Sequence, residues 1–194
     1  GNFVDNITFG PDIVAAFRRL TDLPLDVHLM IAEPARYMDR FIEAGPQTIS
    51  FHVETEESDE AKTEAIAAIR EAGQGAGLAV SPDTPVSAVD PWLEELDVIM
   101  IMSVHPGWGG QGFIPETAPK IAEARARLAQ VGRGGLVHVD GGVNSKTAHV
   151  VGAEGIDVCI VGSALCQRGS DASHEVELVK ERALEAFGSG VGVR

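Results

Sequence analysis

Short apolar runs recur along the chain, and each has the length of a single buried strand. They are rich in Val, Ile, Leu and Met. Runs of this kind are typical of strands that are covered on both faces. We predict six strands, at residues 25–30, 48–53, 76–80, 98–102, 136–140 and 157–161.

The stretches between these runs have helical periodicity. Their apolar positions recur at spacings of three and four residues, as one face of an amphipathic helix requires. Capping residues support two of them, since Gly45 follows the helix at 33–44, and Ser58 and Gly73 flank the helix at 59–72. We predict seven helices, at residues 11–20, 33–44, 59–72, 86–95, 117–131, 146–152 and 173–187.

This alternation of strands and helices predicts a parallel α/β fold. No linker or shift in composition divides residues 1–194, so we predict a single domain. No dinucleotide-binding glycine fingerprint follows the first strand, which favours a closed (β/α)8 TIM barrel over a doubly wound sheet. Such a barrel has eight strands, and six are visible. Because the chain opens on a loop and a helix at 11–20 rather than on a strand, we expect two strands and one helix to precede it.

The chain is strongly acidic, with 15 Lys and Arg against 29 Asp and Glu and a formal net charge of −14. Such a surface repels nucleic acids and anionic membranes, so neither is an expected partner. A small anionic ligand would need a local positive field, from helix N-termini or a metal ion.

Cys159 lies in an apolar run, which predicts a buried free thiol. The absence of a disulfide framework, a signal peptide and a long apolar span predicts a cytoplasmic location.

The candidate chemistry falls at strand ends, where barrels of this class place their sites. His28 and Asp140 end two predicted strands, and an imidazole with a carboxylate suits a divalent metal or proton transfer. Each also has a structural interpretation, as a hydrogen-bonded histidine or an Asp-Gly turn. By strand parity Asp26 shares the face of His28, and His138 shares that of Asp140. Whether His138 belongs to the core or supports the site stays open. Parity also puts His52 and Glu54 on one face of their strand.

Small residues follow the last two predicted strands, at Gly141-Gly142 and at Gly162-Ser163. Backbone N–H groups in such turns can approach an anion, and barrels commonly hold a phosphate after their last two strands. The alternative is that the glycines only make tight turns. Residues 105–112 place glycines on both sides of Trp108, which predicts a lid that closes over a substrate. A flexible surface loop is the alternative there.

Five segments together resemble the ribulose-phosphate 3-epimerases. They are FVDNITFGP (3–11), PLDVHLM (24–30), MSVHPGWGGQGFIPE (102–116), VDGGVN (139–144) and VGSAL (161–165). The resemblance implies a barrel of the ribulose-phosphate-binding type that interconverts D-ribulose 5-phosphate and D-xylulose 5-phosphate. It implies one divalent metal ion, which is zinc, iron, manganese or cobalt. It also implies two aspartates, of which one removes the C3 proton to give a cis-enediolate and the other returns a proton on the opposite face. Members of the family often form dimers or hexamers, so a homo-oligomer is an expected assembly.

On this sequence the resemblance makes Asp140 a catalytic acid–base and, with His28, a metal ligand. His28 and Asp140 are also expected to contact the substrate. The other substrate-binding residues that it implies are Met30, Met102, Gly107, Trp108, Gly109, Gly110, Gly141, Gly142, Gly162 and Ser163. Two positions depart from the family pattern, because His105 stands where Asn or Glu is common and Trp108 where Phe is common.

The resemblance places the second aspartate in a further His-x-Asp pair, which would lie on a strand before Gly1. We therefore expect the 194 residues alone to be inactive as an epimerase. Two alternatives stay open. One is an epimerase of a ketohexose 6-phosphate such as allulose 6-phosphate, and the other is a non-catalytic barrel that binds phosphosugars.

Overall fold

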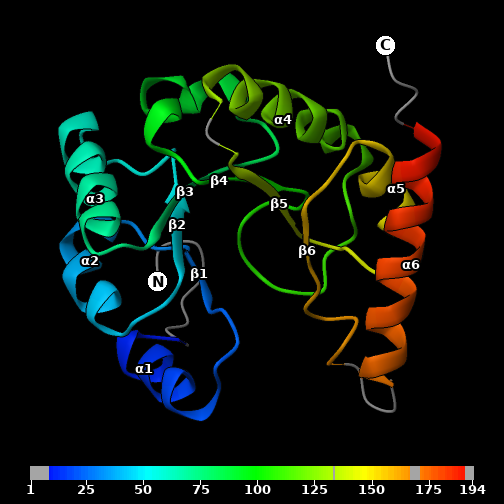
Figure 1. Ribbon diagram of the computed structural model, residues 1–194, viewed down its shortest axis with the longest axis horizontal. Helices are drawn as coiled ribbons and strands as arrows, with labels where there is room; N and C mark the ends of the chain where they lie inside the picture. Colours follow the sequence, from blue (N-terminus) through cyan, green and yellow to red (C-terminus); the bar gives the residue numbers. More distant parts are fainter. Residues whose placement is uncertain (1–8, 133, 167–170, 191–194) are drawn as a thin grey trace.

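The computed structural model describes residues 9–132, 134–166 and 171–190, and within them six parallel strands form one curled sheet (Figure 1). Neighbours in the sheet follow the order of the chain from β1 to β6. The strands are β1 (Asp26–Leu29), β2 (Thr48–His52), β3 (Gly75–Val80), β4 (Val98–Met102), β5 (Leu136–Asp140) and β6 (Val158–Ile160). Each matches a predicted strand to within one residue at either end, and the sheet has the curl of a half-barrel, which confirms the predicted fold class.

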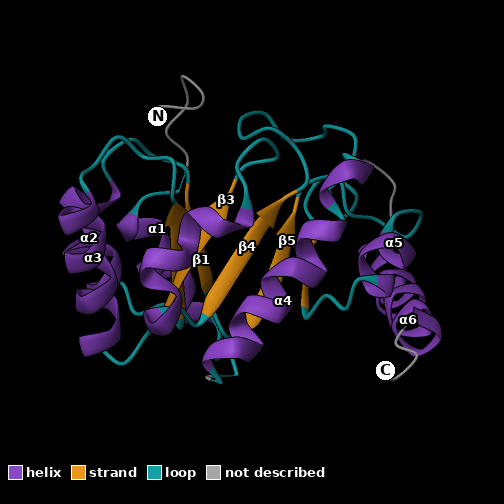
Figure 2. Cartoon of the chain, turned by 90° about the horizontal axis from the view of Figure 1, so that it is seen from above, coloured by secondary structure: helices purple, strands orange, loops and turns teal. Residues whose placement is uncertain are grey.

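Helices surround the convex side of the sheet, and the loops after the strands gather along one edge of it (Figures 1 and 2). The α-helices are α1 (Pro11–Leu20), α2 (Pro34–Glu43), α3 (Asp59–Glu71), α4 (Pro119–Val131), α5 (Ala148–Ala153) and α6 (Ala172–Gly190). Two 3₁₀ helices are η1 (Val86–Glu95) and η2 (Pro115–Thr117). Ser58 caps α3 as predicted, because its hydroxyl accepts a hydrogen bond from the N–H of Ala61.

The structure corrects one helix in type. The segment 86–95, predicted from helical spacing, forms the 3₁₀ helix η1. Its buried residues Val86, Val89 and Trp92 recur every third position, which is the period of a 3₁₀ helix. Pro91 lies inside the segment and has no N–H to donate, which disfavours an α-helical ladder there.

The two faces of the sheet differ in character. The outer face packs on the helices and carries fully buried apolar side chains, such as Ile49, Phe51, Ile99, Val137 and Val139. On the inner, concave face a smaller apolar cluster lies beside the ionisable side chains. Its fully buried members are Ala79, Met100 and Met102, with Met30, Val104 and Ile160 packed against them.

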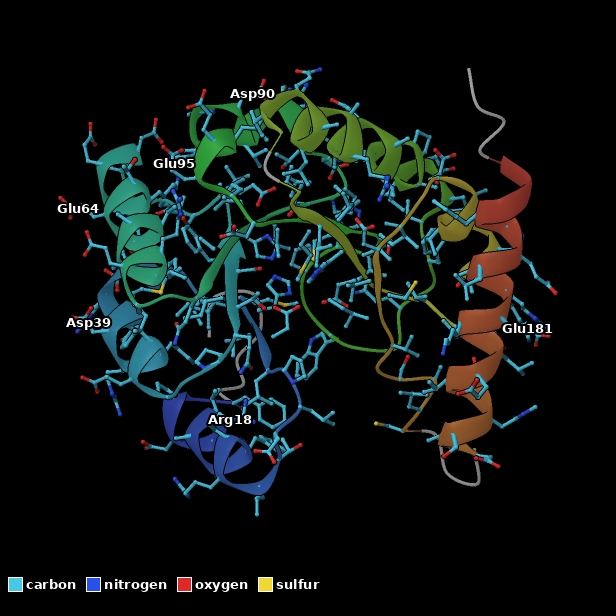
Figure 3. The ribbon with its side chains drawn as sticks, viewed as in Figure 1. Arg18, Asp39, Glu64, Asp90, Glu95 and Glu181 are labelled. Atoms are coloured by element: carbon cyan, nitrogen blue, oxygen red, sulfur yellow. The ribbon has the colours of Figure 1, made fainter. Side chains whose placement is uncertain are left out.

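Acidic side chains on the outer helices point away from the sheet, as Asp39, Glu64 and Glu181 do in Figure 3. Much of the negative charge therefore faces solvent, outside the curl. No helix in the described ranges combines the length and the apolar character that crossing a bilayer requires.

Cys159, predicted as a buried free thiol, is free and only partly buried. It lines a cavity of about 590 Å³ between β6 and α6, and burial raises the pKa of its thiol to about 11. A second cavity, of about 450 Å³, lies beside α1 and β1. Both cavities are mainly apolar and lie beside the edge strands of the sheet, β6 and β1.

Candidate active site

Two side-chain pairs join β1 to β5 across the inside of the curl. His28 Nδ1 lies 3.3 Å from Asp140 Oδ2, and His138 Nδ1 lies 3.0 Å from Asp26 Oδ2. Three strands separate β1 from β5 in the sheet, so these side chains meet only because the sheet curls. The shared faces expected from parity are confirmed for both strands.

The Asp26–His138 pair forms a layer beneath the His28–Asp140 pair. His138 is only 4% exposed. Burial raises the pKa of Asp26, but hydrogen bonds from His138 and Thr48 outweigh this and lower it below its usual value. The question that parity left open is answered: His138 is a buried residue that pairs with Asp26.

His28 also contacts a histidine to which the sequence analysis assigned no role. Its Nε2 lies 3.0 Å from Nε2 of His52, and His52 Nδ1 lies 3.1 Å from Glu54 Oε2. The backbone N–H of Ser81 donates to Glu54 Oε1 at 2.6 Å. The sequence signal for this arrangement was the alternation His-x-Glu at the end of a strand, although alternation alone does not say what the side chains touch.

A pocket of about 130 Å³ opens beside Asp140 at the carboxyl ends of the strands. Every predicted substrate-binding residue except His28 lines it, and its other lining residues come mainly from the loop after β4. The predicted residues that it brings together are Met30, Met102, Gly107, Trp108, Gly109, Gly110, Asp140, Gly141, Gly142, Gly162 and Ser163. Of the described residues that line the pocket, Asp140 is the one with an ionisable side chain. His28 contacts this carboxylate from β1.

The loop after β4 is folded over the pocket and is held by its own hydrogen bonds. Gln111 Nε2 donates to the carbonyl oxygens of His105, at 2.8 Å, and Trp108, at 2.9 Å. At the base of the loop the N–H of Ile114 donates to the Ser103 carbonyl at 2.9 Å. The side chain of Trp108 is 63% exposed in this arrangement. The loop thus has a defined shape over the pocket, with its aromatic residue largely in solvent.

The two glycine turns have different surroundings. Gly141 and Gly142 have φ values of +124° and +64°, and they pack against the loop after β4. A Cβ on Gly142 would lie 2.7 Å from Cα of Phe113, so packing alone accounts for glycine there. Gly162 has no heavy atom within 4 Å of where a Cβ would stand, so packing does not require glycine at that position.

The chemistry of the donor set at His28 and Asp140 fits a divalent metal. Burial lowers the pKa of His28 despite the hydrogen bond and charge of Asp140, which favours the neutral imidazole that binds metals. One imidazole nitrogen and one carboxylate oxygen suit zinc, iron, manganese and cobalt alike. In the part of the chain that the structure describes, no group of three or more His, Cys, Asp or Glu side chains is placed to hold a metal ion. Among the described residues, His28 and Asp140 are therefore two candidate ligands.

The curled parallel sheet, with its polar cluster at the carboxyl ends, defines a TIM-barrel type of enzyme architecture. Solved structures agree on the fold. One is 3-hexulose-6-phosphate synthase from Salmonella typhimurium, with a TM-score of 0.67 and 19% identity, covering 91% of this chain and 81% of the other. Another is 3-keto-L-gulonate-6-phosphate decarboxylase from Vibrio cholerae, with a TM-score of 0.69 and 13% identity, covering 90% and 78%.

Sequence comparison narrows the class. The model of the ribulose-phosphate 3 epimerase family matches residues 1–166, and the chain belongs to this family of isomerases. The ribulose-phosphate 3-epimerase of Bacillus subtilis is 44% identical over 166 residues, which span 85% of this chain and 75% of that protein. The chloroplastic ribulose-5-phosphate-3-epimerase of Arabidopsis thaliana is 42% identical over 165 residues, spanning 85% and 58%.

Proposed function

We propose that this protein epimerises C3 of D-ribulose 5-phosphate to give D-xylulose 5-phosphate, with the help of a divalent metal ion. The observation that carries the proposal is the place of Asp140, whose carboxylate meets His28 beside a pocket lined by the strand ends and the loop after β4. Membership of the epimerase family supports the type of reaction and the sugar phosphate as substrate.

In this proposal Asp140 transfers a proton at C3 of the sugar, on one face of the substrate. A carboxylate in hydrogen-bond reach of a carbon acid serves as base in one direction and, once protonated, as acid in the other. Inversion also requires a second group on the opposite face, a role that the family resemblance assigns to a further aspartate.

His28 and Asp140 would hold the metal ion. When bound, the ion would polarise the oxygens next to C3 and so acidify the C3–H bond. Met30 and Met102 give the pocket an apolar wall, and the loop 105–112 limits the access of water to the carbanionic centre. The backbone around Gly141, Gly142, Gly162 and Ser163 faces the same pocket and would hold the phosphate.

The test is turnover of D-ribulose 5-phosphate by the full-length protein, by its Asp140→Asn variant and by a matched control, Asp39→Asn. Asp39 is exposed on the outer side of α2 (Figure 3). Asp140→Asn is expected to lower the rate by about 10²–10⁴-fold, the usual contribution of a general acid–base, and the control is expected to leave it unchanged. Equal turnover of allulose 6-phosphate would replace the pentose assignment, and binding of both sugars without turnover would favour a non-catalytic barrel.

A further inference from the structure

Ser103, the first residue after β4, joins the loop after β4 to the turn that follows Asp140. Its backbone N–H donates to the Asp140 carbonyl at 2.8 Å, and its carbonyl accepts from the Ile114 N–H at 2.9 Å. Its hydroxyl donates to the Gly141 carbonyl at 2.6 Å and also lies 3.1 Å from the Asp140 carbonyl oxygen. Ser103 is completely buried and does not line the pocket at Asp140. Any effect of its hydroxyl on a ligand therefore passes through the turn.

The Ser103 hydroxyl has one proton and two carbonyl oxygens within reach. The shorter distance marks the Gly141 carbonyl as the main acceptor, since the other oxygen already receives the N–H of the serine itself. The next carbonyl along the turn, that of Gly142, accepts from the side chains of Asn144, at 3.0 Å, and Thr147, at 3.1 Å. In the part of the chain that the structure describes, the serine hydroxyl is thus the donor that holds the peptide group between the two glycines.

The backbone itself leaves that peptide group free to turn. Its rotation changes ψ of Gly141 and φ of Gly142, and glycine accepts both signs of φ about equally. The two residues have φ values of +124° and +64°. In a trans peptide the N–H points away from the carbonyl, so a Gly141 carbonyl that points to Ser103 directs the N–H of Gly142 to the opposite side. The serine hydroxyl therefore selects one orientation of this N–H.

The orientation of this N–H matters because the turn lines the pocket. Gly141 and Gly142 both line it, together with Gly162 and Ser163 after β6. A backbone N–H binds an anion well only when it points at the anion. We propose that Ser103 is a positioning residue, whose hydroxyl holds the Gly141 carbonyl and so turns the N–H of Gly142 toward the phosphate of the substrate. The proposal rests on the proposed function for the sugar phosphate and adds a residue that acts on it only through the turn.

The variant Ser103→Ala isolates the hydroxyl. Alanine keeps the N–H that holds the Asp140 carbonyl and the carbonyl that accepts from Ile114, so only the donor to Gly141 is lost. The matched control is Thr117→Val. Thr117 is also buried, and its hydroxyl donates to the Ile114 carbonyl at 2.7 Å, at the base of the same loop. Both variants lose one buried bond from a hydroxyl to a carbonyl, and only Ser103→Ala changes the turn.

The first test is a titration of the full-length protein with inorganic phosphate, followed by ¹⁵N–¹H NMR. In the wild type and in Thr117→Val, the Gly142 amide signal is expected to shift as phosphate binds. In Ser103→Ala the dissociation constant is expected to rise by about 10-fold or more, the usual effect of losing a hydrogen bond to a charged group. An unchanged dissociation constant in a folded Ser103→Ala variant would overturn the proposal, and so would a Gly142 signal that does not respond to phosphate in the wild type.

The second test is the steady-state kinetics of the same full-length variants with D-ribulose 5-phosphate. Ser103→Ala is expected to raise KM by about 10-fold or more. Its kcat should stay close to that of the wild type, because the bound substrate and the transition state carry the same phosphate. A purely structural role would instead reduce the fraction of folded enzyme, so a fall in kcat at constant KM would contradict the positioning role.

The two proposals fail separately. A protein that shows the expected phosphate affinities but does not turn over D-ribulose 5-phosphate would disprove only the proposed reaction. A protein that epimerises the sugar, with equal phosphate affinity and equal KM in the wild type and Ser103→Ala, would disprove only the positioning role.

Discussion

Alanine at Gly142 should destabilise the fold, whereas alanine at Gly162 should not. Gly142 has a φ of +64°, in the left-handed region, where a side chain costs about 1–2 kcal/mol. Its new Cβ would also lie 2.7 Å from Cα of Phe113 and 3.0 Å from the carbonyl carbon of Gly112. Both contacts are to backbone, which cannot rotate away as a side-chain tip can. Overpacking of this kind typically costs about 1–3 kcal/mol.

The two contributions at Gly142 predict a loss of about 2–5 kcal/mol in the free energy of unfolding. In a chain of this size that corresponds to a fall in Tm of roughly 4–20 °C. Gly162 has open space around it, so Gly162→Ala is expected within about 0.5 kcal/mol of the wild type.

Urea unfolding of both variants, with comparison of their m-values, measures this difference. Gly162→Ala adds a methyl group beside the pocket, so it should weaken binding of the sugar phosphate while stability is kept. The reasoning is refuted if Gly142→Ala unfolds at the same urea concentration as the wild type, or if Gly162→Ala is the less stable of the two variants.

Two further predictions concern stability. The folded-state pKa of Glu54, about 2, is below its unfolded value of 4.5, so the group stabilises the fold above pH 4.5 and loses this contribution as pH falls toward 2. The unfolding free energies of wild type and Glu54→Gln should therefore converge between pH 4.5 and 2, and a gap that is independent of pH would be the contrary result. Lys120 Nζ donates to three loop carbonyls in 81–84. Lys120→Met should therefore lower the free energy of unfolding by about 2 kcal/mol in a denaturant titration. The control Lys146→Met, at an exposed lysine, should change it little.

The strands and their inner faces were predictable because both depend on local periodicity. The strand β4, for example, is predicted by its own apolar run and the turns on either side, without any knowledge of its tertiary contacts. Alternation likewise placed Asp26 with His28, and His138 with Asp140, before any partner was known. The type of η1 was missed because a repeat of three residues was read as part of a period of 3.6.

The contacts across the curl were not predictable in the same way. Whether β1 reaches β5 depends on how strongly the sheet bends, which accumulates over all the strands between them. The contact between His52 and His28 was missed for that reason, since it is identified by a distance and not by a spacing in sequence. Parity showed that His52 and Glu54 share a face, and only the fold shows that this face meets His28.

The most direct test of Asp140 as a proton-transferring group is exchange of the C3 hydrogen in ²H₂O. The full-length protein is incubated with Zn²⁺ or Co²⁺ and with each of the two pentulose phosphates, and the C3 proton signal is followed by ¹H NMR. The signal is expected to disappear with the wild type and with Asp39→Asn. With Asp140→Asn it is expected to persist almost unchanged. Undiminished exchange with a folded Asp140→Asn variant would contradict the role given to this carboxylate.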